Sequence, residues 1–169
     1  PIWMREKLFL KNVLLNEINK HFKINKNQLL FSNHHLSHAA SAFFPSPHEK
    51  SLILTIDGVG EWSTTAISLG KKNQIIQKEV LEFPHSLGLL YSAFTYYLGF
   101  KVNSGEYKIM GLAPYGEPKY FDLIKNNIVD IKNDGSFRVN LKYFNYSTGL
   151  EMINKKFEKI FNHKRRIPE

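Results

Sequence analysis

The sequence predicts a mixed α/β fold in which an antiparallel three-strand meander is packed by helices. Residues 51–56, 64–69 and 74–80 are the strand candidates, because each is a short apolar run bounded by turn-forming residues. The connections between them are short, whereas parallel strands would need a crossover of about a dozen residues or more. Stretches with apolar residues at helical spacing precede and follow the strands, and they supply the packing layer.

Two helices are predicted before the strands. Residues 3–22 are amphipathic, with apolar residues at Met4, Leu8, Leu15, Ile18 and Phe22. Residues 34–44 form the second helix, which Asn33 caps and Pro45 ends.

The remaining elements follow the strands. Ser86 is predicted to cap a helix that ends near Gly99 and packs on the meander. Apolar spacing and turn residues then predict further helices at 104–112, 118–125 and 152–161, and a hairpin at 128–139 that turns at Asp134-Gly135.

The length and composition are those of a globular domain. The chain has 169 residues, of which 43% are hydrophobic and 22% are charged. We expect one compact unit over residues 1–169, because no repeat or low-complexity linker marks an internal boundary. The chain begins Pro-Ile-Trp, without an initiator methionine or a signal peptide, so we interpret it as an interior fragment of a longer protein.

Composition also restricts the partners. No apolar run is long enough to span a bilayer, so no membrane partner is expected. The chain has no cysteine, which fits a reducing cytoplasm and leaves only nitrogen and oxygen ligands for a metal. The formal net charge of +8 attracts anions, but the basic residues are scattered, which favours solvated faces over a nucleic-acid site.

The densest group of imidazoles lies in the predicted helix 34–44. His34 and His38 are four residues apart, so they project from one face of the helix and can bind one ion, whereas His35 points about a quarter-turn away. Imidazoles suit zinc, iron, nickel or copper, and the spacing does not choose among these metals. Surface histidines or a capping cluster would give the same pattern, and the spacing leaves both interpretations open.

A carboxylate and two glycines follow the first predicted strand. We expect Asp57 to end that strand, and Gly58 and Gly60 to permit positive φ and a close approach of the backbone to a ligand. Asp57 would then hold a metal, while the amides of Gly58, Val59, Gly60 and Glu61 contact a phosphate. An ordinary hairpin turn is the alternative, because Asp-Gly is common between strands.

A third polar group begins the predicted helix 104–112. Lys108 is a candidate contact for a phosphate or a leaving group, and Glu106 is a candidate catalytic residue at an anion-binding entry. Glu106 has a simpler interpretation, because an acidic residue in the first turn of a helix is favourable whatever the function.

Four ordered motifs resemble one family, the carbamoyltransferases that modify nodulation factors and antibiotics such as aminoglycosides and cephalosporins. They are NHHLSHAASAFFP at 33–45, TIDGVGEW at 55–62, FPHSLGLLY at 83–91 and SGEYKIMGLAPYG at 104–116. The resemblance runs from about Phe31 to the C-terminus.

The resemblance implies a fold and a reaction. The fold is part of an N-terminal domain of the actin-like ATPase (ribonuclease-H-like) class, similar to the metalloprotein that transfers threonylcarbamoyl to tRNA. A second domain in the family makes carbamoyladenylate from carbamoyl phosphate and ATP, and the N-terminal domain passes the carbamoyl group to the hydroxyl of a small-molecule acceptor. The fragment by itself is expected to be inactive.

The resemblance also implies a ligand set. The metal ligands carry over to His34, His38 and Asp57, for iron(II) first and otherwise zinc or manganese; the family's fourth ligand, a later aspartate, has no matching motif here. Two other functions share these features: a tRNA threonylcarbamoyl-transfer subunit, and a non-catalytic nucleotide- or metal-binding module. Glu61-Trp62 and residues 108–116 favour a carbamoyltransferase that acts on a small molecule. A homo-oligomer is left open.

Overall fold

The computed structural model describes residues 9–168, which fall into two compact parts, residues 9–33 and residues 34–168. The first part contains helix α2 (Leu10–Ile18) and a 3-10 turn, η1 (Lys26–Gln28). The predicted helix 3–22 is confirmed over α2, whereas residues 3–8 lie outside the described residues. Its predicted end was wrong, because the Asn19 side chain accepts a hydrogen bond from the Ile24 amide at 2.8 Å and the chain turns. The absence of an internal domain boundary stays a prediction.

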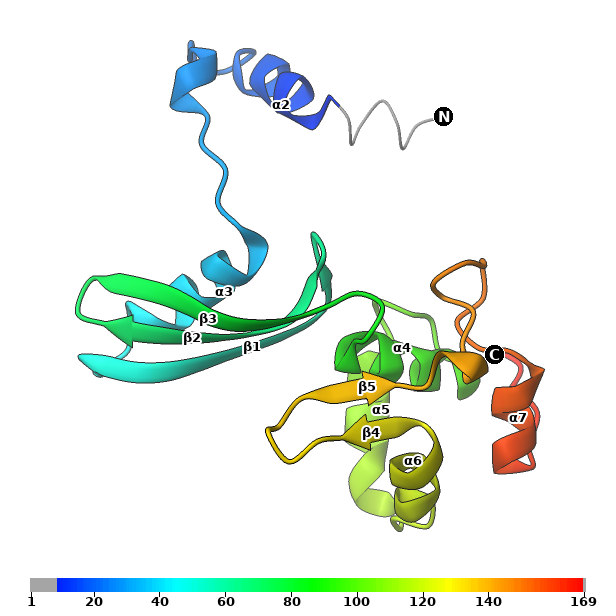
Figure 1. Cartoon of the computed structure of the whole chain (residues 1–169). Coiled ribbons are helices and arrows are strands. Elements are labelled where there is room, and N and C mark those ends of the chain that lie inside the picture. The colour runs from blue at the N-terminus through cyan, green and yellow to red at the C-terminus, as the bar shows by residue number, and fades with distance from the viewer. Residues whose placement is uncertain (1–8, 169) are drawn as a thin grey trace. The chain divides into compact units, whose positions relative to one another are not determined.

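The second part is a mixed α/β structure, as predicted. Helix α3 (His34–Phe43) is followed by a three-stranded antiparallel sheet of β1 (Lys50–Gly60), β2 (Ser63–Lys71) and β3 (Gln74–Glu82), in the order β1-β2-β3 (Figure 1). The meander is therefore confirmed, and each strand is longer than predicted.

The elements after the sheet also match the predicted order. They are α4 (Leu87–Tyr97), α5 (Glu106–Leu112), η2 (Ala113–Tyr115), α6 (Phe121–Asn127), the hairpin β4 (Val129–Ile131) and β5 (Phe137–Val139), η3 (Leu141–Tyr143) and α7 (Lys155–Phe161). Ser86 caps α4 as predicted, since its side chain accepts a hydrogen bond from the Leu89 amide. The hairpin turns at Gly135, which has a φ of 85°. No helix among residues 9–168 has both the length and the apolar character needed to cross a membrane.

Two hydrophobic cores hold this part together. In the small one, Ala39 and Phe43 of α3 pack on Ile53 of β1. The larger one gathers buried side chains of α4, the β4–β5 hairpin, η3, α7 and the segments next to them, which are Leu90, Ala93, Tyr97, Ile128, Val129, Phe137, Val139, Tyr143, Phe144, Ile153, Phe157 and Phe161. Helix α4 also contacts β1, so it links the sheet to the larger core.

Candidate metal centre

The rotation of α3 about its own axis decides where its histidines point. His35, Ala39 and Phe43 are four residues apart, and all three are buried. The Phe43 ring fits closely over Gly70 of β2, where an added Cβ atom would lie 2.7 Å from the ring. These three side chains face the sheet. His34 and His38, on the adjacent side of the helix, therefore lie at the edge of the contact between helix and sheet and are partly open to solvent.

Strand β1 brings a carboxylate to the same place. The pairing of β1 with β2 shifts register between Ile56 and Gly60, and Asp57 lies within this bulge. One carboxylate oxygen, Oδ1, accepts a hydrogen bond from the Gly58 amide at 2.6 Å. The other, Oδ2, lies 2.5 Å from His34 Nε2 and 3.3 Å from His38 Nε2.

The three side chains form a compact set of donor atoms. His34 Nε2 and His38 Nε2 are 3.0 Å apart, and one ligand atom from each of the three residues lies within 4.8 Å of the others. Ligand atoms about 2.1 Å from one ion and at right angles to each other lie about 3.0 Å apart. Two imidazoles and one carboxylate on one side of an ion are the facial arrangement that binds iron(II), and they also suit zinc. The residues present therefore fit a divalent cation.

The electrostatics of Asp57 favour this role. Burial has the largest single effect and would raise the pKa of the carboxyl, but hydrogen bonds from His34 and Gly58 and the charges of His34 and His38 together outweigh it. The pKa therefore lies below its ordinary value of 3.8, so the group is an anion at neutral pH. An ionised carboxylate is the form that binds a metal.

Helix α4 also supports Asp57. The buried Ser86 hydroxyl donates to the backbone carbonyls of Gly58, at 2.7 Å, and Asp57, at 3.1 Å, while it accepts from the Leu89 amide. An added Cβ at Gly88 would lie 2.6 Å from the Gly58 nitrogen, so only glycine allows this approach of the helix to the strand. The sequence identified Ser86 only as a cap; its second function, fixing the backbone of Asp57, was missed.

Comparison with known proteins identifies the family. A family model described as the carbamoyltransferase N-terminus matches residues 1–168. The chain belongs to this family. An uncharacterised protein of Synechocystis sp. is 60% identical over 170 residues, which are 99% of the chain and 28% of that protein.

Two further relatives are nodulation proteins. Nodulation protein NolNO of Sinorhizobium fredii is 39% identical over 137 residues, covering 80% of the chain and 19% of that protein. Nodulation protein NolO of Bradyrhizobium diazoefficiens is 40% identical over 111 residues, covering 64% of the chain and 20% of that protein. The chain thus spans less than a third of the length of each of these three relatives. The resemblance inferred from the four motifs is confirmed at the level of the family.

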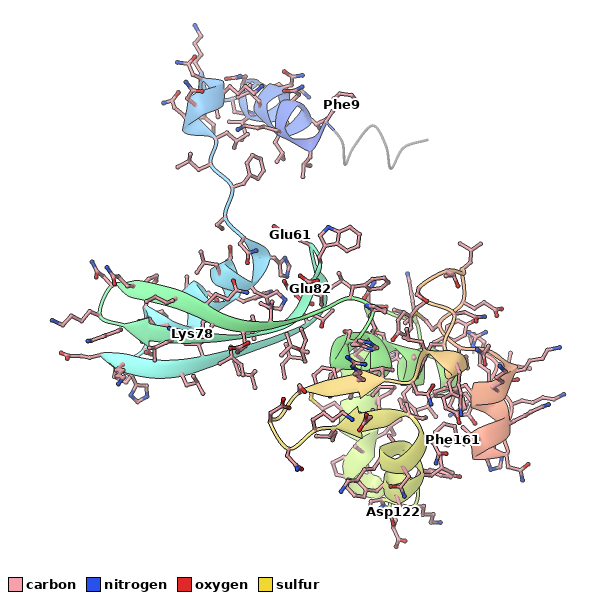
Figure 2. The ribbon with its side chains drawn as sticks, in the orientation of Figure 1. Phe9, Glu61, Lys78, Glu82, Asp122 and Phe161 are labelled. Atoms are coloured by element: carbon pink, nitrogen blue, oxygen red, sulfur yellow. The ribbon has the colours of Figure 1, made fainter. Side chains whose placement is uncertain are left out.

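The segment after Asp57 in this carbamoyltransferase N-terminus differs from the predicted turn. Strand β1 continues through Gly60, and the chain turns at Glu61-Trp62; Glu61, with a φ of 62°, lies at the tip of the hairpin (Figure 2). The prediction that Asp57 ends the strand was wrong, and neither Gly58 nor Gly60 adopts the positive φ that glycine permits. The bulge lets the strand bend without a left-handed glycine, and Gly60 is needed for space instead, because an added Cβ would clash with the His34 ring. The Gly58 amide already donates to Asp57.

Glu106 and Lys108 lie outside the group of three. Glu106 Oε1 accepts from the Ser92 hydroxyl and the Asn103 amide, both at 2.9 Å, and Oε2 accepts from the Gly105 amide at 3.1 Å. Burial would raise the pKa of Glu106, but these hydrogen bonds lower it overall. On α4, Gly88 contacts the backbone of Asp57, and Ser92, which bonds Glu106, lies four residues later. The two contacts are therefore about 6 Å apart along the helix axis.

Lys108 extends over an aromatic ring. Its Nζ lies 5.8 Å from the centre of the Phe100 ring, within the range of a cation–π contact. Gly105 allows this part of the chain to fold back, because an added Cβ would lie 2.7 Å from Phe100 Cβ. The sequence predicted the helix that carries both residues, and the structure adds that Glu106 ties its start to α4.

Proposed function

We propose that this chain carries the metal-binding part of a carbamoyltransferase that moves a carbamoyl group from carbamoyladenylate to a substrate hydroxyl. The observation that supports the proposal best is the convergence of His34, His38 and Asp57 in a chain of this family. Two consecutive elements, α3 and β1, bring the three donors together through their tertiary packing, and local helix or turn propensity does not account for that.

In this proposal the three residues hold a divalent cation, iron(II) in preference to zinc or manganese. A bound cation would act as a Lewis acid toward the carbamoyl carbonyl and the acceptor hydroxyl. Asp57 contributes the negative charge; the Gly58 amide holds its carboxylate, and the Ser86 hydroxyl holds its backbone carbonyl. His34 and His38 come from one rigid helix, so their separation is fixed before an ion binds.

The leaving group of carbamoyladenylate is AMP, and the chain offers two candidate contacts for its phosphate. Gly58, Val59, Gly60 and Glu61 border Asp57, and we propose this segment as the nearer contact. Lys108 is the second contact, as a cation that can turn from the Phe100 ring toward an anion. We propose Glu106 as the group that holds the loop before Lys108, because its two oxygens accept three hydrogen bonds.

We also propose that the chain is one portion of an actin-like ATPase (ribonuclease-H-like) domain. The outer side of β1 supports this, because Leu52, Leu54 and Ile56 are 70%, 59% and 51% exposed on one face of the sheet. Among residues 9–168, β1 pairs only with β2, so its other edge is available to a further strand. A complete domain would cover this face. The 169 residues alone are therefore expected to be inactive, and the complete enzyme is expected in the cytoplasm.

Metal titration of the chain tests the metal centre. We expect iron(II), under anaerobic conditions, to raise the melting temperature of the chain. The gain in stability is about 2.7 kcal/mol when the free metal is 100 times its Kd. Asp57→Asn and His38→Ala are expected to remove this gain, while His48→Ala, at an exposed histidine in the loop before β1, is expected to keep it. An equal gain in His38→Ala and the parent chain would contradict the proposal.

Carbamoyl transfer needs its own test. The coding sequence that flanks this chain would be expressed with it and supplied with carbamoyl phosphate, ATP and hydroxyl acceptors. We expect a carbamoylated product and AMP, both lost in Asp57→Asn. Binding of tRNA without transfer to small acceptors would favour a threonylcarbamoyl-transfer subunit, and nucleotide or metal binding without any transfer would favour a non-catalytic module.

A further inference from the structure

His35 lies between the two candidate metal ligands of α3 in sequence, yet it points away from them. Its side chain is buried, with 1% of the residue exposed. Both ring nitrogens have partners: Nδ1 lies 2.7 Å from the Thr55 hydroxyl, and Nε2 lies 3.0 Å from the backbone carbonyl of Ser63.

These partners determine which nitrogen of His35 carries a proton. A carbonyl oxygen only accepts, so Nε2 has to donate to Ser63. Nδ1 faces the Thr55 hydroxyl, whose other contact, the carbonyl of Ala66, is longer at 3.4 Å. Neither nitrogen has a lone pair directed at the group of three donors, so His35 is not a metal ligand in this arrangement.

The two partners of His35 bracket the segment that carries Asp57. Thr55 lies two residues before Asp57, and Ser63 lies just after the Glu61-Trp62 turn. The register shift of β1 falls between these two anchors. One buried ring on α3 is therefore bonded to both ends of the bulged segment, while the next residue toward the N-terminus, His34, meets Asp57 in the middle of it.

We propose that His35 is the positioning residue of the metal centre: it sets the bulged segment with Asp57 against the helix that carries His34 and His38. The proposal rests on the proposed function, since it assigns His35 to the metal site defined there. Residues that orient metal ligands through hydrogen bonds change metal affinity by about 10- to 100-fold when they are replaced. A histidine that only fills the core would change stability without this change in affinity.

Cobalt(II) titration of the full chain separates these two roles, because its visible spectrum reports the coordination. Thr55→Val removes the hydroxyl that faces Nδ1 and preserves the shape of the side chain. We expect it to weaken the cobalt Kd by about 10- to 100-fold and to alter the spectrum. Thr55→Ser keeps the hydroxyl, and we expect its cobalt Kd and its visible spectrum to match those of the parent chain.

The matched control is another buried threonine. Thr95 of α4 donates its hydroxyl to the Tyr91 carbonyl at 3.0 Å, away from the three donors. We expect Thr95→Val to lower stability by an amount similar to Thr55→Val and to leave the cobalt Kd within about twofold. Equal Kd values for the two valine variants would overturn the positioning role.

A second measurement keeps this proposal distinct from the metal proposal. If the parent chain binds no cobalt, the proposed metal centre fails, and His35 is then judged from NMR spectra of the metal-free chain. We expect a slowly exchanging Nε2 proton on His35 and amide shifts at Gly58 and Gly60 in Thr55→Val. Shifts confined to Thr55 and its direct strand neighbours would overturn the proposal.

Discussion

Gly60 lies directly against the imidazole of His34. A Cβ atom at this position would lie 2.8 Å from His34 Cγ and closer still to Cδ2, and it would also meet His35 Cδ2 at 3.1 Å. The glycine is therefore required by the space between β1 and α3. The absence of one methyl group lets the strand approach the helix closely enough for Asp57 and His34 to meet.

Gly60→Ala is accordingly expected to displace the His34 ring. The strain should cost about 1–3 kcal/mol of stability, and the affinity for a divalent metal should fall by about tenfold or more. Metal titration and thermal unfolding of the full chain measure the two effects. Gly58→Ala is the control, because its Cβ would lie 3.9 Å from Leu89 Cδ2, an ordinary contact. Metal affinities that fall equally in both variants would contradict this explanation.

Glu106 is expected to stabilise the start of α5 as a carboxylate. Its pKa lies below the ordinary value of 4.5, so its contribution is complete above that pH and is lost as the pH falls through the lower pKa of the folded state. Glu106→Gln should have a free energy of unfolding about 1 kcal/mol lower than that of the parent chain at neutral pH. As the pH falls, its free energy of unfolding should decrease less than that of the parent chain. Urea unfolding from pH 7 to pH 3 measures this.

The control for Glu106 is Glu79→Gln, at an exposed position of β3. This variant is expected to follow the parent chain at each pH. If the free energy of unfolding of Glu106→Gln also changes with pH as that of the parent chain does down to pH 3, the hydrogen bonds to Glu106 do not stabilise its ionised form.

The paired histidines show how far the sequence alone could lead. Four-residue spacing placed His34 and His38 on one helical face, and Pro45 marked where that helix had to end. The convergence with Asp57 was inferred from the family resemblance, because spacing holds no information on how a helix meets a strand. That depends on the burial of Ala39 and Phe43, which sets the rotation of α3.

The turn after β1 shows why other details were missed. Asp-Gly normally indicates a tight turn, yet here it begins a bulge inside the strand. The residue with positive φ is Glu61, and glutamate is not a residue that predicts a left-handed conformation. His35 was likewise assigned no role from sequence, because its partners at Thr55 and Ser63 are tertiary neighbours.

Tyr146 is expected to make the chain sensitive to alkaline pH. Burial raises the pKa of its phenol from 10.0 to about 12, and its hydroxyl donates to the Pro84 carbonyl at 3.1 Å. Between these pH values the unfolded chain loses the proton and the folded chain keeps it, so stability falls as pH rises. Tyr146→Phe should be about 1 kcal/mol less stable at pH 8 and should lose less stability between pH 10 and pH 12.

The chain has eight tyrosines, so the comparison needs a matched variant. Tyr115 is 89% exposed, and Tyr115→Phe is expected to leave the alkaline slope unchanged. Guanidinium unfolding at a series of pH values gives the slopes. A Tyr146→Phe slope equal to that of the parent chain would rule out Tyr146 as the source.

Thr64 and Thr65 are adjacent on β2 and both are buried, but their hydroxyls differ. Thr64 donates to the His85 carbonyl at 2.6 Å, whereas Thr65 Oγ1 has no hydrogen-bond partner within residues 9–168. A buried hydroxyl without a partner costs about 1–3 kcal/mol, and a satisfied one stabilises. Thr65→Val is therefore expected to raise the free energy of unfolding by about 1 kcal/mol, and Thr64→Val to lower it by about 1–2 kcal/mol. Chemical denaturation should show changes of opposite sign in the free energy of unfolding of the two variants. A lower free energy of unfolding in Thr65→Val would mean that the Thr65 hydroxyl of the parent chain is solvated or hydrogen-bonded in solution.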